Sequence, residues 1–189
     1  MTHWRRISLL LAATLATACH SSGAPGNPTA KATAVLSPYE AKAKLQGMLD
    51  DTFEAIVPDM KFREGWPSVT ENDQPPGTAN VALDRYVMTR VSAAKYGALL
   101  GVVERHWKAR GYVIESVNAD PTMPAIFAQS ADGSSLSLRV GYPGNITIGA
   151  DVNPINSTGN PFGPQPPQPT LPNGNPDILP TIDDPFWSH

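Results

Sequence analysis

The stretch SSLSLRVGYPGNITIGADV, residues 134–152, decides the fold class. Apolar and polar residues alternate in its first half, and the alternation returns in its second half. A period of two is typical of strands that bury one face. Pro143-Gly144 between the halves has the chemistry of a type II turn. The stretch predicts an antiparallel hairpin with these buried side chains: Leu136, Leu138, Val140, Ile146, Ile148, Ala150 and Val152.

The residues that precede this stretch predict three more strands and a helix. Asp132-Gly133 is a strong hairpin signal that joins the stretch to a strand over 125–130. A turn at Pro121 and Pro124 leads back to a strand over 112–117, and another strand is expected over 82–91. Between them, a helix capped by Ser92 and ended by a left-handed Gly111 is expected. Its buried stripe is Tyr96, Leu99, Leu100, Val103 and Trp107.

An earlier helix begins at Ser37-Pro38-Tyr39-Glu40, which is a capping box with proline at the first helical position. Pro58 ends it. Residues 58–80 are polar and proline-rich, so we expect a long loop that is functional or disordered. The order α-β-α-β-β-β-β with hairpin spacing predicts the α+β class, with an antiparallel sheet of about five strands and two helices on one face.

Residues 96–152 resemble a small domain found in secreted proteins and lipoproteins of high-GC Gram-positive bacteria. The resemblance covers about 57 of the 189 residues. That family has no assigned activity, so the resemblance implies an extracytoplasmic compartment and a fold, and no mechanism. The motifs that carry it are Gly97-Ala-Leu-Leu-Gly101, Trp107-Lys108, Gly111-Tyr112, a strand from Pro124 to Ala128, Asp132-Gly133, and Gly141 with Gly144.

The N-terminus, residues 1–18, has the pattern of a secretory signal peptide. Residues 1–6 supply two arginines and no acid, and residues 7–18 form an uncharged, mostly apolar run. That run has twelve residues, whereas a membrane span needs about 20. We therefore expect export rather than a transmembrane anchor.

Cys19, the only cysteine of the chain, follows Ala16-Thr17-Ala18 directly. This arrangement resembles the bacterial lipobox, which implies a diacylglyceryl group on Cys19 and anchoring at the extracytoplasmic face of the cell membrane. The match departs at one place, because the family prefers leucine where Ala16 stands and Leu15 lies one position earlier. The alternative is ordinary cleavage after Ala18 and a secreted protein. With a single thiol, no intramolecular disulfide forms.

The remaining segments flank one domain. Residues 19–36 are expected to be a lipidated flexible stalk, 37–152 the domain, and 153–189 a disordered proline-rich tail. We expect the tail to be removable without loss of stability, and to act as an arm or a polyproline ligand for cell-wall or envelope proteins. Docking of Phe186-Trp187 onto the domain is the competing possibility.

Charge argues against a nucleic-acid partner. The chain has a formal net charge of −3, and loss of residues 1–18 with their two arginines moves it to −5. An acidic chain without a basic block lacks the cations that neutralise phosphates.

No catalytic, cofactor-binding or metal-ligating constellation emerges from the sequence. His106 is the one histidine of the predicted domain, and we expect it to be a residue at the rim of the second helix. The carboxylates of Asp50, Asp51 and Glu54 fit a solvated face of the first helix. A shallow polar binding surface is one interpretation of Trp66, Tyr86, Arg90 and Arg139. The alternative is ordinary cross-strand pairing of these residues with Asp84, Glu115 or Asp151.

The sequence thus favours a membrane-anchored, non-enzymatic binding domain. The alternative is a small extracytoplasmic hydrolase whose site lies between the 58–80 loop and the sheet. An enzyme should bring at least two titratable groups together in a concave pocket, which a binding domain need not do.

Overall fold

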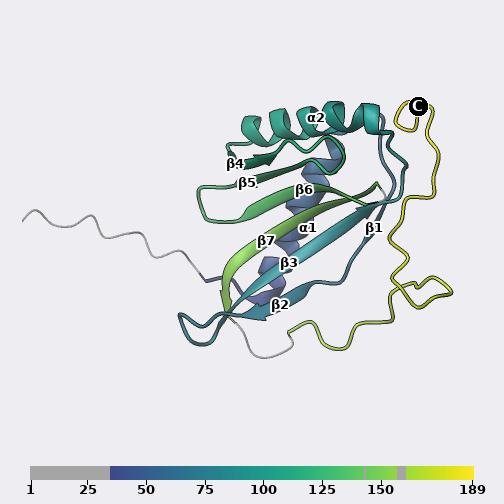
Figure 1. The fold of residues 1–189 in the computed structure, drawn as a ribbon. Helices are drawn as coiled ribbons and strands as arrows, with labels where there is room; N and C mark the ends of the chain where they lie inside the picture. The colour runs from purple at the N-terminus through teal and green to yellow at the C-terminus, as the bar shows by residue number, and fades with distance from the viewer. Residues whose placement is uncertain (1–34, 143, 157–160) are drawn as a thin grey trace, which may run out of the picture. The chain divides into compact units, whose positions relative to one another are not determined.

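The computed structural model describes residues 35–142, 144–156 and 161–189 (Figure 1). The predicted signal peptide, Cys19 and most of the predicted stalk lie outside the described residues. The fold is α+β, with one antiparallel sheet of seven strands and two α-helices in the described part of the chain. In chain order the elements are α1 Pro38–Glu54, β1 Phe62–Glu64, β2 Ser68–Glu71, β3 Thr78–Val87, the 3₁₀ turn η1 Ala93–Lys95, α2 Tyr96–Ala109, β4 Val113–Asn118, β5 Ala125–Gln129, β6 Ser135–Gly141 and β7 Asn145–Asn156.

The strands lie in the order β1-β3-β7-β6-β5-β4, and β2 also pairs with β3. β1 and β2 share one edge of β3, because Phe62 lies opposite Val87 and Val69 lies opposite Val81. Between them the Gly65 N–H still donates to the Asp84 carbonyl at 2.8 Å. Residues 62–71 are therefore one interrupted edge strand, broken at Pro67, which has no N–H to donate.

This edge strand corrects two predictions. The long loop over 58–80 is wrong, because β1, β2 and the first residues of β3 occupy much of it. The count of about five strands is too low for the same reason. Each of these edge strands has only three or four residues, which is too short for an alternation to be recognised in the sequence.

The β6–β7 hairpin is confirmed, with Leu138 opposite Ile148 and Leu136 opposite Ala150. β7 runs further than expected, to Asn156, where it pairs with Thr78 at the start of β3. Ile155 in this extension is fully buried. The predicted domain boundary after Val152 is therefore too early, since Asn153-Pro154 interrupted the alternation without ending the strand.

The capping box of α1 is confirmed. The Ser37 N–H donates to Glu40 Oε2 at 2.8 Å, and the Glu40 N–H donates to Ser37 Oγ at 3.4 Å. The predicted Ser92 cap of α2 is wrong: its side chain makes no capping hydrogen bond, and η1 precedes the helix. Gly111 follows α2 with a φ of +88°, as expected for a left-handed C-terminal position.

Both helices cover one face of the sheet. The buried stripes of α1 and α2 join inward side chains of β3, β5, β6 and β7 in a single apolar cluster. Trp107 of α2 is fully buried, and its Nε1–H donates to Thr52 Oγ1 of α1 at 2.9 Å. The opposite sheet face carries polar side chains, among them Asp84, Tyr86, Ser137, Arg139, Thr147 and Asp151.

The C-terminal segment, residues 161–189, contacts the domain over its last part. Thr181 and Ile182 donate their N–H groups to the Met88 carbonyl, both at 2.9 Å, and the Arg90 N–H donates to the Ile182 carbonyl at 2.7 Å. Trp187 has only 1% of its surface exposed, and its Nε1–H donates to the Pro58 carbonyl at 2.8 Å. Figure 1 shows this yellow segment passing β1 and ending near the start of α2.

The prediction of a disordered tail over 153–189 is therefore wrong for residues 153–156 and 181–189. That the tail can be removed without loss of stability stays a prediction. Residues 153–156 belong to β7, and the described residues belong to one compact unit. The alternative, docking of the end of the chain onto the domain, is confirmed for Trp187. Single anchoring side chains and backbone pairing produce no periodic pattern that a sequence could display.

Candidate functional site

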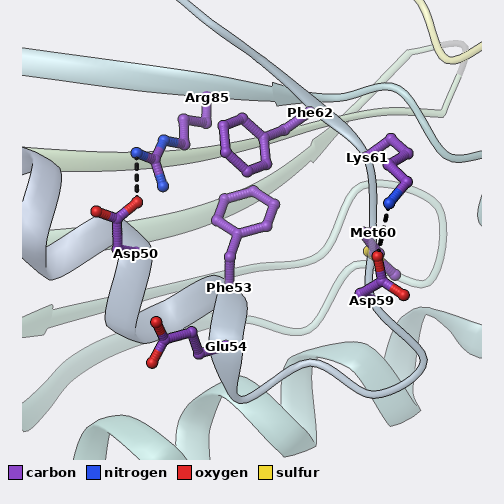
Figure 2. Close-up of a pocket in the computed structure, with 8 residues that line it drawn as sticks. All are labelled: Asp50, Phe53, Glu54, Asp59, Met60, Lys61, Phe62 and Arg85. Carbon is purple, nitrogen blue, oxygen red and sulfur yellow. Dashed lines mark hydrogen bonds and ion pairs between the residues drawn. The ribbon is translucent and has the colours of Figure 1, made fainter.

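A cavity of about 390 Å³ opens between the last turns of α1, residues 59–62 and β3 (Figure 2). The α-helical period places Asp50, Phe53 and Glu54 on neighbouring positions at this end of α1. Arg85 stands at an inward position of β3, with Glu64 opposite it in β1. The lining residues are Asp50, Phe53, Glu54, Asp59, Met60, Lys61, Phe62 and Arg85.

Arg85 is the buried charge of this pocket, with 4% of its side chain exposed. Its Nε and Nη2 donate to Glu64 Oε2 at 3.1 and 3.0 Å, and Nη2 lies 2.7 Å from Asp50 Oδ1. Its guanidinium carbon lies 4.3 Å from the ring centroid of Phe62, within the range of a cation–π contact. The third nitrogen, Nη1, is buried and has no hydrogen-bond partner among the described residues.

Aromatic and apolar groups form the walls. The rings of Phe53 and Phe62 lie 4.5 Å apart between centroids at an angle of 47°, a geometry typical of attractive aromatic pairs. Met60 is nearly fully buried beside them. Figure 2 shows Arg85 beside the ring of Phe62, the ring of Phe53 below them, and a dashed line from Asp50 to the guanidinium. The cavity thus combines an apolar wall with a buried donor.

At the mouth of the cavity, Lys61 Nζ lies 2.7 Å from Asp59 Oδ2. The hydrogen bond and the charge of Lys61 lower the pKa of Asp59, and the hydrogen bond and the charge of Asp59 raise the pKa of Lys61. Both shifts move the pKa away from neutrality, so both groups stay charged near pH 7. A general acid or base needs a pKa close to the working pH, and this pair is therefore better suited to recognition than to proton transfer.

Of the surface residues predicted from the sequence, Tyr86 and Arg139 come together on the open sheet face. Both lie opposite Thr147 of β7, one on each side. Arg139 Nη2 donates to Asp84 Oδ1 at 3.1 Å, which is the cross-strand pairing considered as the alternative. Burial raises the pKa of Tyr86, and the nearby Asp84 carboxylate raises it further.

The Asp84–Arg139 pair crosses β7 above Gly149. Gly149 lies opposite Asp84 on one side and Ser137 on the other. A Cβ at Gly149 would lie 2.3 Å from Asp84 Oδ1 and 3.1 Å from Ser137 Oγ. The absence of a side chain there therefore leaves the space that the pair occupies. This surface is already internally paired.

Trp66 and Arg90 lie in other surroundings. Trp66 is 37% exposed between β1 and β2. Arg90 comes after the end of β3 and lines a separate hollow of about 260 Å³ with Val91, Tyr96, Gly144, Leu179 and Pro180. The structure therefore does not bring Arg90 to Tyr86 and Arg139, and the four residues do not form one surface.

A third hollow, of about 450 Å³, lies at the β6–β7 turn. Tyr142 on its edge is 87% exposed. The sequence did not indicate this hollow because its walls come from three separate segments. They are Ala93, Tyr96, Pro121, Thr122, Met123, Gly141, Tyr142 and Gly144.

His106 of α2 links the two helices through a contact with Asp51 of α1. Its Nε2 lies 2.7 Å from Asp51 Oδ2, and Arg110 also bonds this carboxylate. Burial raises the pKa of Asp51, but the hydrogen bonds from Arg110 and His106 outweigh it, so the net shift is downward.

In the described ranges, no three His, Cys, Asp or Glu side chains are grouped to hold a metal ion. Nor does a helix there have the length and apolar run needed to cross a membrane.

Comparison with known proteins finds no matching family model, no matching curated protein and no matching solved structure. The resemblance of residues 96–152 to the domain of secreted proteins and lipoproteins thus stays a prediction.

The Arg85 pocket was missed as a site by sequence reasoning. One signal for it was present, since Arg85 shares the strand face of Leu83 and Val87, where an apolar residue is expected. A charge in the buried register of a strand needs partners. What the sequence could not show is that β1 would supply Glu64 and Phe62 to this arginine.

Proposed function

We propose that this chain is a lipid-tethered binding module on the extracytoplasmic face of a bacterial membrane. The single observation that carries the proposal is Cys19, the only cysteine, placed directly after a signal-like run that ends in Ala-Thr-Ala. Two acyl chains on such a cysteine anchor a protein stably. A secreted form without lipid is the alternative.

The described fold is compatible with a tether at its N-terminal end. Leu36 bridges to Ile155 at the far end of β7, next to the start of α1. α1 has 17 residues, so its other end lies about 25 Å away at 1.5 Å per residue. The Arg85 pocket lies at that other end. A ligand would therefore bind at the end of α1 opposite to the tether.

The anchor is tested by replacing Cys19. In cells fed a radiolabelled fatty acid, the native chain should carry label and sediment with membranes, and Cys19→Ala should do neither. A Ser21→Ala chain serves as the control and should behave as the native chain does. Native protein that is recovered soluble, with an unmodified Cys19 thiol, would contradict the proposal.

A partner protein is proposed for the proline-rich part of the C-terminal segment. Pro164, Pro166, Pro167 and Pro169 are exposed, and a run of this kind fits the aromatic grooves that bind polyproline helices. Replacing the four prolines by serine should abolish co-purification of an envelope partner. An unchanged set of partners would refute this role.

A small hydrolase is the second candidate, favoured by the carboxylates that the Arg85 pocket brings together: Asp50, Glu54 and Asp59. Asp59 and Lys61 argue against it, since both are held in their charged forms. Turnover of chromogenic esters, phosphates or glycosides that disappears in Glu54→Gln would establish this candidate instead.

A further inference from the structure

The Arg85 pocket contains a buried donor that the protein itself leaves unused. Arg85 is 4% exposed, and its Nη1 has no partner in the described part of the chain. A buried, unpaired polar group is costly, so native structures rarely keep one without a reason. Figure 2 shows the end nitrogen of Arg85 that carries no dashed line pointing between Asp50 and Phe53, and both of these residues line the cavity. A ligand oxygen placed there would complete the bonding of the guanidinium.

The charges around the pocket favour a cation. Its lining supplies three carboxylates against two basic side chains, and Glu64 adds a further negative charge behind Arg85. Asp50 and Asp59 each have a basic partner within the pocket. Glu54 is an exposed residue at the end of α1, and the cation near it is Arg110, which is not part of the pocket lining. A positively charged ligand group near Glu54 would balance this excess.

The apolar walls limit the rest of the ligand. Phe53, Phe62 and Met60 form the apolar part of the lining of the cavity, whose total volume of about 390 Å³ lies in the range of small-molecule sites. An aliphatic or aromatic side chain would fill that part of the cavity. The three requirements are thus an acceptor oxygen, a cation within a few ångströms of it, and an apolar body.

From these features we infer that the pocket binds an α-ammonium group next to a carbonyl oxygen, carried by an apolar residue. A free amino acid and the N-terminus of a peptide share this chemistry. The carbonyl oxygen accepts from Arg85 Nη1, the ammonium group pairs with Glu54, and the apolar side chain packs on Phe53 and Phe62. Because Nη1 is buried, side chains at the cavity wall shift for the carbonyl oxygen to reach it. The inference rests on the proposal that the chain is a binding module, and it names the ligand class.

The test is calorimetric titration of the full chain with four probes: leucine, leucyl-glycine, leucinamide and N-acetyl-leucine. The first three carry the ammonium group and the carbonyl oxygen and should bind. N-acetyl-leucine lacks the ammonium group and should not. Tighter binding of leucyl-glycine than of leucine assigns the site to peptide N-termini, and the reverse order assigns it to free amino acids. Equal binding of N-acetyl-leucine and leucine, or no heat from any probe at millimolar concentration, overturns the inference.

Two variants locate the binding. Glu54→Gln removes one exposed charge and should weaken leucine binding about fivefold, while the matched Glu115→Gln on β4 should leave it unchanged. Arg85→Lys keeps the charge and removes Nη1, so binding should be lost; if that variant does not fold, Glu54→Gln still decides. Equal binding by Glu54→Gln and Glu115→Gln places the ligand elsewhere and overturns the inference.

The lipid anchor on Cys19 and the assignment of the ligand can be refuted independently of each other. A native chain that carries lipid on Cys19 and binds no probe overturns the ligand assignment alone. A chain without lipid that binds leucine overturns the tether alone.

Discussion

Helix α2 and the C-terminal segment each place one tryptophan in the same core. Trp107 and Trp187 are both buried, and both donate Nε1–H to an oxygen, Thr52 Oγ1 at 2.9 Å and the Pro58 carbonyl at 2.8 Å. Trp107 shares its helix with four other buried residues, whereas Trp187 is the one buried residue among described positions 161–189. The same side chain thus belongs to a cooperative element in one case and is a single anchor in the other.

The two tryptophans are expected to contribute differently to the stability of the fold. Removing an anchor from α2 leaves a cavity inside an element that the sheet needs, whereas we expect the C-terminal segment to be able to detach while the sheet stays folded. Backbone bonds to Met88, Arg90 and Ser92 accompany the docking of Trp187. The cost of losing Trp187 is therefore limited to the free energy of docking the segment.

Trp107→Ala should have the largest effect. Truncating a fully buried tryptophan costs about 3–5 kcal/mol, and here it also leaves Thr52 Oγ1 without its donor. Urea denaturation followed by circular dichroism measures the loss. Trp66→Ala, at a partly exposed position, is the matched control and should stay within about 0.5 kcal/mol. Equal losses in the two variants would mean that α2 is not the central packing element.

Trp187→Ala should cost less, about 1–3 kcal/mol, because the segment detaches instead of leaving a cavity. Limited proteolysis should then cleave residues 176–189 in the variant while the sheet persists. Phe186→Ala, whose native ring is 43% exposed, serves as the control. A loss as large as that of Trp107→Ala would show that the segment unfolds together with the sheet.

Asp184→Ala should have the smallest of the three effects, about 1 kcal/mol. Asp184 Oδ1 accepts from the N–H groups of Phe186 and Trp187 at 2.9 and 2.8 Å, which fixes the turn that presents the indole. Asp183→Ala is the control, since Asp183 is exposed and pairs with His189. Identical thermal midpoints for the two variants would contradict a role for this turn.

The sequence predicted the parts of the fold in which burial is spread over a repeating pattern. The capping box at Ser37, the stripe that ends at Trp107 and the alternation around Leu138 each follow a local rule, and each is confirmed. The α+β class and the antiparallel sheet follow from these elements and their turns.

The sequence could not predict the parts that depend on a single distant contact. Phe62 and Glu64 gain their strand only by pairing with β3, and Trp187 reaches Pro58 across 129 positions of chain. Neither contact leaves a periodic trace. Ser92 has the right residue type for a helix cap, but η1 lies between it and α2.

Of the candidate site, the sequence predicted only its approximate position near residues 58–80. An enzyme site near residues 58–80 was considered, and the cavity does use residues 59–62. Arg85 lies in an apolar register of its strand, a signal that the sequence analysis did not use. The surroundings of Arg85 Nη1 and the contact between Phe53 and Phe62 depend on how β1 pairs with β3. No local sequence pattern predicts that pairing.

Amide hydrogen exchange tests most directly the claim that the C-terminal segment belongs to the fold. The N–H groups of Arg90, Ser92 and Thr181 bond only across this contact. They should exchange roughly 10- to 100-fold more slowly than in an unfolded chain, and faster than the β7 amide of Ile148, because the segment opens locally. Exchange of all three at the rate of an unfolded chain, with Ile148 still protected, would contradict the claim.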